Sequence, residues 1–134
     1  ISHTYFNSSK FTKMKIFIIG GSLLLALTVL SGAFGAHILK EKISIDYLRI
    51  YEKGIQYQAY HSIALILIGL LGYNFPHQFL WFPALCFILG IILFSGSLYV
   101  LAVSNIKWIG MLTPIGGLSF ILGWIYLAWI VYRN

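Results

Sequence analysis

The sequence predicts an all-α protein, an integral membrane four-helix bundle with an amphipathic interfacial segment between helices one and two. Of its 134 residues, 60% are hydrophobic and 9% are charged, whereas a soluble domain typically carries about 25% charged residues. Such a chain lacks the polar groups to cover a water-facing surface. Four apolar runs are each long enough to cross a hydrocarbon core of roughly 30 Å as a helix. Because backbone groups in lipid must be bonded internally, helices are the spanning form that these runs allow.

The first apolar run defines the start of the membrane domain. We expect residues 1–14 to be a poorly ordered N-terminal extension and residues 15–134 to form a single four-span membrane domain. The first span is predicted at residues 16–36, which contain no charged side chain. His37 follows it directly.

The segment that follows is too polar to cross a membrane. Residues 38–54 contain all three acidic residues of the chain and four of its nine basic ones, alternating with isoleucine and leucine. This pattern is typical of an amphipathic helix that lies at the membrane interface. Ser44 is a suitable N-cap for it, because a serine hydroxyl can accept a hydrogen bond from a free backbone N–H of the first turn.

Three further spans are predicted, at residues 55–72, 79–103 and 108–132. The fourth contains the dipeptide Thr113-Pro114, which favours a helix start with Thr113 as N-cap and Pro114 at the first helical position. Residues 108–112 would then form a separate short piece. The alternative is one helix that is kinked near Gly110.

Because the chain is predicted to cross the membrane four times, both termini lie on one side of it. Four basic residues then fall on the side of the termini and five on the opposite side, which does not decide the orientation. If the chain starts at Met14, only two basic residues remain on the side of the termini against five on the opposite side. This second distribution favours a cytoplasmic first loop. The net charge of +6 is spread along the edges of the apolar runs rather than gathered in one patch. This distribution indicates the lipid bilayer as partner and excludes nucleic acid.

Small residues recur inside the predicted spans. Glycines on one helix face let a neighbouring helix approach closely. We therefore expect helix packing at Gly21, Gly32, Gly35, Gly96, Gly116 and Gly117.

Polar residues also occur inside the spans, and His61 is the most informative of them. An ionisable group within the membrane is by default a candidate functional residue, although a neutral histidine bonded to a neighbouring hydroxyl is the simpler interpretation. Burying polar groups without partners costs roughly 1–3 kcal/mol each, so we expect these side chains to gather. The candidate polar intramembrane cluster comprises His37, Gln56, Tyr57, His61, Ser95, Ser97, Tyr99, Thr113 and Pro114.

No cofactor is expected from these residues. The single cysteine, Cys86, lies in an apolar run, and the chain has no Cys/His pattern typical of a metal site. The one alternative is a haem whose iron is held axially by His37 and His61 on adjacent helices.

Four strings occur in order along the chain: Gly-Ala-Phe-Gly-Ala-His at 32–37, Gln-Tyr-Gln-Ala-Tyr-His at 56–61, Leu-Phe-Ser-Gly-Ser-Leu-Tyr at 93–99 and Thr-Pro-Ile-Gly-Gly at 113–117. In order and spacing they resemble the small bacterial inner-membrane proteins of the YgdD type, a domain-of-unknown-function family with animal relatives. The resemblance covers most of the chain from Met14 to Trp129. It implies a four-span protein of the inner (cytoplasmic) membrane without an established activity.

No catalytic motif is present. The sequence therefore favours a non-enzymatic accessory or membrane-organising protein whose polar cluster binds a lipid-soluble ligand, acting as a homo-oligomer or within a larger membrane complex. Two alternatives remain open: a small oligomeric transporter or channel subunit, and a haem- or quinone-binding electron-transfer protein.

Overall fold

The computed structural model describes residues 8–75 and 77–134, and within them every regular element is helical. The elements are α1 (Ser8–His37), η1 (Leu39–Glu41), α2 (Ile45–Leu71), α3 (His77–Gly90), η2 (Ile91–Ser95), α4 (Gly96–Ser104), η3 (Lys107–Met111) and α5 (Leu112–Arg133). They make four helical segments long and apolar enough to cross a membrane: Met14–Glu41, Ile45–Leu71, Phe79–Ser104 and Lys107–Arg133. The predicted all-α, four-span architecture is confirmed.

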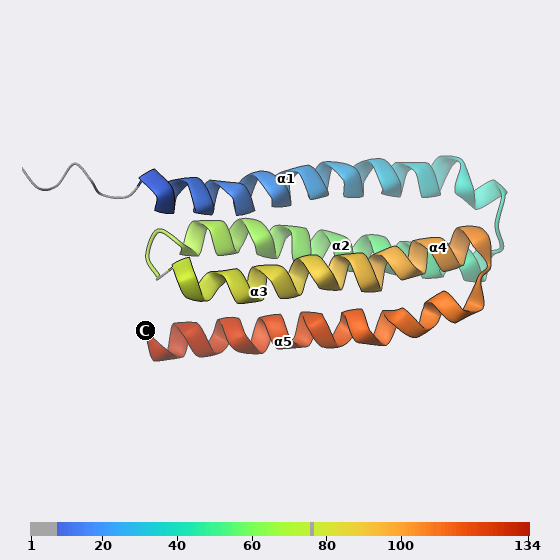
Figure 1. Cartoon of the computed structure of the whole chain (residues 1–134). Helices are drawn as coiled ribbons and strands as arrows, with labels where there is room; N and C mark the ends of the chain where they lie inside the picture. Colours follow the sequence, from blue (N-terminus) through green and yellow to red (C-terminus); the bar gives the residue numbers. More distant parts are fainter. Residues whose placement is uncertain (1–7, 76) are drawn as a thin grey trace, which may run out of the picture.

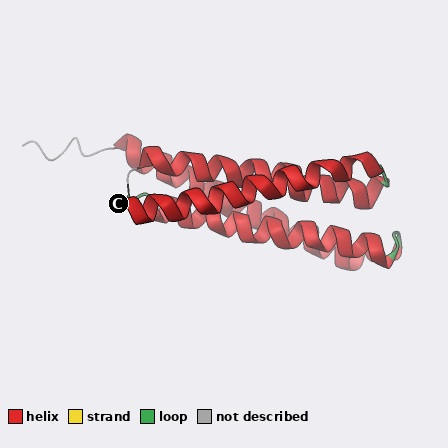
Figure 2. Ribbon diagram, turned by 90° about the horizontal axis from the view of Figure 1, so that it is seen from below, coloured by secondary structure: helices red, strands yellow, loops and turns green. Residues whose placement is uncertain are grey.

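The four spans run side by side along a common direction (Figure 1). The start of α1 and the end of α5 lie at the same end of the bundle, as expected for four spans, and the described loops lie at its two ends (Figure 2). Helix α1 packs mainly on α2 and α5 mainly on α3, while the third span (α3, η2 and α4) also contacts α2. The most hydrophobic stretches of α2 and the third span are 44% and 39% buried, against 17% and 22% for the first and fourth spans. The second and third spans are therefore the central ones.

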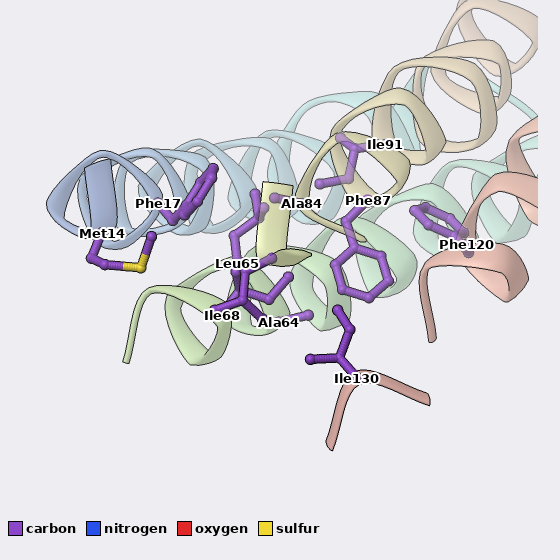
Figure 3. Close-up of a cluster of buried hydrophobic side chains, with 11 residues drawn as sticks. Met14, Phe17, Ala64, Leu65, Ile68, Ala84, Phe87, Ile91, Phe120 and Ile130 are labelled. Carbon is purple, nitrogen blue, oxygen red and sulfur yellow. The ribbon is translucent and has the colours of Figure 1, made fainter. Parts of the chain in front are cut away.

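The apolar core fills the space among these spans (Figure 3). Its largest fully buried side chains include Phe87 from α3, Leu65 and Ile68 from α2, and Met14 from α1. The outward faces of all four spans carry large exposed hydrophobic side chains, most densely on α1 and α5. Such faces are stable where lipid covers them.

The amphipathic segment differs from the expectation in one respect. Residues 45–54 are the first turns of α2 and not a separate interfacial helix, so the second helix begins ten residues earlier than predicted. Ser44 does cap it, since its hydroxyl accepts a hydrogen bond from the Tyr47 N–H. Residues 53–55 contain no proline, and α2 runs through Gly54 without a break, so the hydrogen-bonded ladder continues into the span. Tyr51 packs against Leu39 and Ala102, which draws this polar half of α2 into the bundle.

The predicted N-terminal extension overlaps the first helix. Helix α1 begins at Ser8, so residues 8–14 are its first turns. Met14 is fully buried. Residues 1–7 lie outside the described part of the chain.

The third span contains a feature that the sequence did not predict. Residues Ile91–Ser95 form a π-helical turn between α3 and α4. A π-turn inserts one residue into a helix and is found frequently at functional sites. Here it contains Phe94 and Ser95, which contact neighbouring helices.

The fourth span begins with a short 3₁₀ segment, but α5 starts two residues before Pro114 and Thr113 does not cap it. The 3₁₀ segment Lys107–Met111 precedes α5, which starts at Leu112 with no side-chain cap. The Thr113 hydroxyl bonds to Ser97 instead. Pro114 is the third residue of α5, where a backbone N–H would have no helical partner in any case. The tight connection before it turns at Asn105, whose left-handed backbone (φ 59°) closes α4.

Three of the six glycines expected in helix packing lie at very close contacts. A Cβ atom would lie 2.6 Å from the Ser62 carbonyl oxygen at Gly21, 2.6 Å from the Tyr51 ring at Gly35, and 2.4 Å from the Phe94 nitrogen at Gly116. Gly32, Gly96 and Gly117 have no neighbour closer than 3.8 Å to such an atom. Further tight positions were not predicted: Gly54, Gly69, Gly72, Gly90 and Gly123.

Candidate functional site

The polar residues inside the membrane form separate groups along the bundle and not one convergent cluster. The first group joins three spans around Gln58, which is 5% exposed. Its amide nitrogen donates to the Leu24 carbonyl of α1 at 3.3 Å, and its amide oxygen accepts from the Tyr99 hydroxyl of α4 at 2.6 Å. Tyr51 adds a second link to α1 by donating to the Ser31 carbonyl at 2.7 Å. This group therefore ties α1, α2 and α4 together.

Two serines of the third span form further cross-links. Ser95, fully buried, donates to the Gly54 carbonyl of α2 at 2.7 Å. The hydroxyls of Ser97 and Thr113 lie 2.6 Å apart and connect α4 to α5. Among the described residues, every buried side-chain nitrogen and oxygen has a hydrogen-bond partner. These groups stabilise the packing of the spans.

His61 belongs to a different group, which joins α2 to α5. The indole N–H of Trp124 can only donate, and it reaches His61 Nε2 at 3.0 Å. Nε2 must therefore be the accepting, unprotonated nitrogen. Nδ1 lies 2.7 Å from the Tyr57 carbonyl and is left as the donor. Both ring nitrogens of His61 are thus engaged, in one defined tautomer.

Aromatic side chains surround this histidine. The Phe120 ring stacks on the imidazole with centroids 3.5 Å apart and planes 9° from parallel. The Phe87 ring lies 5.3 Å from it and also contacts Trp124. Tyr57 contacts Phe94 of the π-turn at 4.6 Å. Stacked and tilted pairs of this kind hold the rings in fixed positions.

A lateral pocket of about 670 Å³ opens beside this aromatic group. It lies where α2 and α5 both pack on the third span, and His61 and Trp124 join the two helices across it. Tyr60, Ile121 and Trp124 are 50%, 54% and 41% exposed on a membrane-facing surface. The pocket is lined by Tyr57, Tyr60, His61, Phe94, Gly117, Phe120, Ile121 and Trp124.

The pocket lies near the middle of the spans. His61 is the seventeenth of the 27 residues of α2, and Phe120 is the midpoint of the segment Lys107–Arg133. The absence of a side chain at Gly117 leaves room, because the nearest atom to a Cβ there would be 3.8 Å away, on the Phe94 ring. The site therefore faces the hydrocarbon interior and not water.

Several predicted site residues lie elsewhere. His37 is exposed at the end of α1. Gly35 beside it contacts Tyr51, and His61 is ten residues further along α2, roughly 15 Å by helical rise. The two histidines are therefore not brought together. Gln56 is exposed and donates to the Tyr60 hydroxyl at 2.5 Å, and Pro114 is exposed near the start of α5.

The prediction missed the α5 side of the pocket. Gly117, Phe120, Ile121 and Trp124 follow the spacing i, i+3, i+4 and i+7, which places them on one helix face. Apolar and aromatic residues are common throughout this span. Which of them line the pocket, rather than face lipid or the core, is decided by the packing of α5 on the π-turn.

The fold and site define a class: a small multi-pass α-helical membrane protein with a laterally open aromatic pocket. The comparisons with known proteins give the family. Residues 31–117 match the family described as Protein of unknown function (DUF423), and this range contains all four strings noted in the sequence. The chain belongs to this family of membrane proteins.

Its relatives carry the same general description. The chain is 50% identical over 120 residues to a UPF0382 membrane protein of Staphylococcus aureus, covering 90% of this chain and 98% of that protein. It is 47% identical over 114 residues to one from Staphylococcus haemolyticus, covering 85% and 93%. It is 41% identical over 122 residues to the UPF0382 membrane protein YwdK of Bacillus subtilis, covering 86% and 94%. No solved structure matches the chain.

Proposed function

We propose that this protein is a non-enzymatic membrane protein of the bacterial inner (cytoplasmic) membrane that binds a lipid-soluble ligand in the lateral pocket between α2 and α5. In this role it acts as an accessory or membrane-organising factor. The observation that carries the proposal is the pocket itself, about 670 Å³ in volume and placed at mid-membrane depth. Small-molecule pockets in proteins typically measure about 300–1,000 Å³.

The lining of the pocket suits an apolar ligand. Five of its eight residues are tyrosine, phenylalanine or tryptophan, which offer flat apolar surfaces. The His61–Trp124 hydrogen bond fixes two of the lining side chains. A pocket held open before binding loses less entropy when the ligand enters.

The same contacts favour binding over acid–base catalysis. A general base needs a nitrogen free to reach the proton that it abstracts. Both His61 nitrogens are engaged within the protein, one with Trp124 and one with the Tyr57 carbonyl. The other buried polar side chains of this part of α2 are also bonded within the protein, Gln58 to Tyr99 and Leu24, and Ser62 to the Gln58 carbonyl.

The test compares hydrophobic molecules that co-purify with the wild type and with a pocket-filling variant. The protein is purified from native membranes in mild detergent, and bound small molecules are extracted and quantified by mass spectrometry. Gly117→Leu adds a side chain that extends into the pocket, whereas Gly117→Ala adds one methyl group without a close contact. Gly20→Leu is the matched control, because Gly20 also has open space but lies on α1 outside this pocket.

We expect a molecule at near-stoichiometric occupancy in the wild type and in Gly20→Leu, reduced in Gly117→Ala and lost in Gly117→Leu. Far-ultraviolet circular dichroism and size-exclusion profiles establish that each variant is folded. Equal occupancy in folded Gly117→Leu and wild type, or no molecule bound to the wild type, would overturn the proposal.

A further inference from the structure

A second hollow lies on α2, closer to its N-terminal end. It has a volume of about 290 Å³ and is lined by Arg49, Glu52, Lys53 and Gln56. All four side chains are exposed. We call it the basic groove.

The basic groove and the lateral pocket are connected along one face of α2. Arg49, Lys53, Gln56 and Tyr60 are spaced by four, three and four residues, which keeps them within about 60° of each other around the helix. Lys53 Nζ donates to Gln56 Oε1 at 3.3 Å, and Gln56 Nε2 donates to the Tyr60 hydroxyl at 2.5 Å. Tyr60 lines the lateral pocket. A continuous row of polar contacts therefore leads from the groove to the rim of the pocket.

The depths of the two hollows match the two parts of a lipid molecule. Lys53 and Arg49 are seven and eleven residues from Tyr60, or roughly 10 and 16 Å along the helix axis. Half of a hydrocarbon core is about 15 Å. With Tyr60 near mid-membrane depth, Arg49 lies at the level of the headgroups. Lys53 lies about 6 Å deeper, from where its long side chain can extend toward them. The aromatic pocket lies where acyl chains end.

The charges of the groove select the headgroup. Arg49 and Lys53 contribute two positive charges and Glu52 one negative charge, which leaves one positive charge. A lipid whose whole headgroup has a net charge of −1 neutralises this groove, whereas a zwitterionic headgroup adds an ammonium group that Arg49 and Lys53 repel. Arginine can bind its oxygens with two parallel hydrogen bonds, and lysine adds a point charge.

We infer that the ligand of the lateral pocket is an anionic glycerophospholipid, with its phosphodiester in the basic groove and one acyl chain between α2 and α5. This inference rests on the proposed function, because it assigns a chemical class to the ligand of the same pocket. The lipid keeps the orientation that it has in its own leaflet, so no reorientation is needed for binding.

The experiment measures how closely a lipid chain approaches Trp124. Trp81, Trp108 and Trp129 are replaced by phenylalanine, which leaves Trp124 as the fluorophore. The protein is reconstituted in phosphatidylcholine vesicles that contain increasing fractions of phosphatidylglycerol brominated in the middle of one acyl chain. Phosphatidylcholine and phosphatidylethanolamine with the same brominated chain report the quenching that surrounding lipid produces without headgroup selection.

We expect brominated phosphatidylglycerol to quench Trp124 at a lower mole fraction than either comparison lipid. A basic side chain near the membrane surface contributes about 1 kcal/mol to the attraction of an anionic lipid, which corresponds to a roughly 5-fold change in affinity. Arg49→Gln and Lys53→Gln should each weaken the preference by about that factor, and the double variant by about 25-fold. Lys42→Gln is the matched control, an exposed lysine at the same end of the bundle outside the groove.

The outcomes separate the inference from the proposed function. If Gly117→Leu lowers the quenching by all three lipids equally and no headgroup preference exists, the pocket binds lipid chains but the anionic headgroup is wrong. If Gly117→Leu leaves all quenching unchanged, the pocket is not occupied and the proposed function itself fails. If the preference for phosphatidylglycerol survives in the variant that carries both Arg49→Gln and Lys53→Gln, the headgroup binds elsewhere and the inference is overturned.

Two further arms test the source and charge of the headgroup. Glu52→Gln should strengthen the preference for phosphatidylglycerol, because it removes a negative charge that repels the headgroup. If the wild type instead prefers phosphatidylethanolamine and Glu52→Gln abolishes that preference, Glu52 binds an ammonium group and the inference is wrong. Inorganic phosphate, compared with chloride at equal ionic strength, should leave the preference unchanged. Displacement of the lipid by phosphate would assign the groove to the free ion.

Discussion

Consecutive glycines at the start of α5 allow a controlled test of how this helix packs on the π-turn. A Cβ at Gly116 would lie 2.4 Å from the backbone nitrogen of Phe94 and 2.8 Å from its Cα. Atoms in favourable contact are about 3.5–4.0 Å apart, so α5 would have to move away by roughly 1 Å. A Cβ at Gly117 would find its nearest neighbour at 3.8 Å, which is an ordinary contact.

The same substitution should therefore have opposite effects at the two positions. Overpacking a close contact typically costs about 1–3 kcal/mol, so Gly116→Ala should destabilise the protein by that amount. Gly117→Ala should be neutral or stabilising by up to about 1 kcal/mol, because alanine is the better helix former. The measurement is the free energy of unfolding in mixed micelles titrated with sodium dodecyl sulfate, followed by far-ultraviolet circular dichroism. Equal free energies of unfolding for the two variants would refute the argued approach of α5 to Phe94.

Three further predictions concern the hydrogen bonds between spans. Tyr99→Phe leaves the buried Gln58 Oε1 without its donor and should lower the free energy of unfolding by about 1–3 kcal/mol in the same assay. A loss below about 0.3 kcal/mol, roughly a tenth of the upper value, would contradict this prediction. Thr113→Val removes the Ser97 partner and should cost about 0.6 kcal/mol, the average for such bonds in membranes, whereas Thr113→Ser should retain wild-type stability. Trp124→Phe removes the donor to His61 Nε2 and should cost about 0.6–1.7 kcal/mol, and a double-mutant cycle with His61→Ala should show coupling between the two residues. Additive losses in that cycle would mean that the bond does not contribute.

The span count and the polar positions depend on properties that are local in sequence. Each apolar run is long enough to cross the bilayer by itself, so composition and run length predict four helices without knowledge of packing. Ser44 could be predicted as a cap because its hydrogen bond reaches only three residues along the chain. His61, Ser95 and Tyr99 could be singled out because a polar side chain within an apolar run must find a partner.

Which partner each residue finds is decided by tertiary structure. Ser95 bonds to a carbonyl 41 residues away, and His61 bonds to a side chain 63 residues away. Thr113 illustrates how a tertiary contact can replace a local one. Its sequence context favours a hydrogen bond to the backbone as an N-cap, yet its hydroxyl bonds instead to the Ser97 hydroxyl of the neighbouring helix, 2.6 Å away. Likewise, the interfacial segment after the first span joined α2, because Tyr51 packs against Leu39 and Ala102.

The sequence by itself determined that this chain is an all-α, four-span membrane protein with polar side chains inside its spans, because hydrophobicity and helical rise are properties of single segments. The tertiary structure decided that these side chains form separate cross-links and that an aromatic pocket opens at the side of the bundle. The pocket exists because α2 and α5 both pack on the third span, with Gly117 leaving space beside Phe94. Phe120 and Trp124 acquire their place only through that packing, since nothing within α5 distinguishes them from side chains that face lipid.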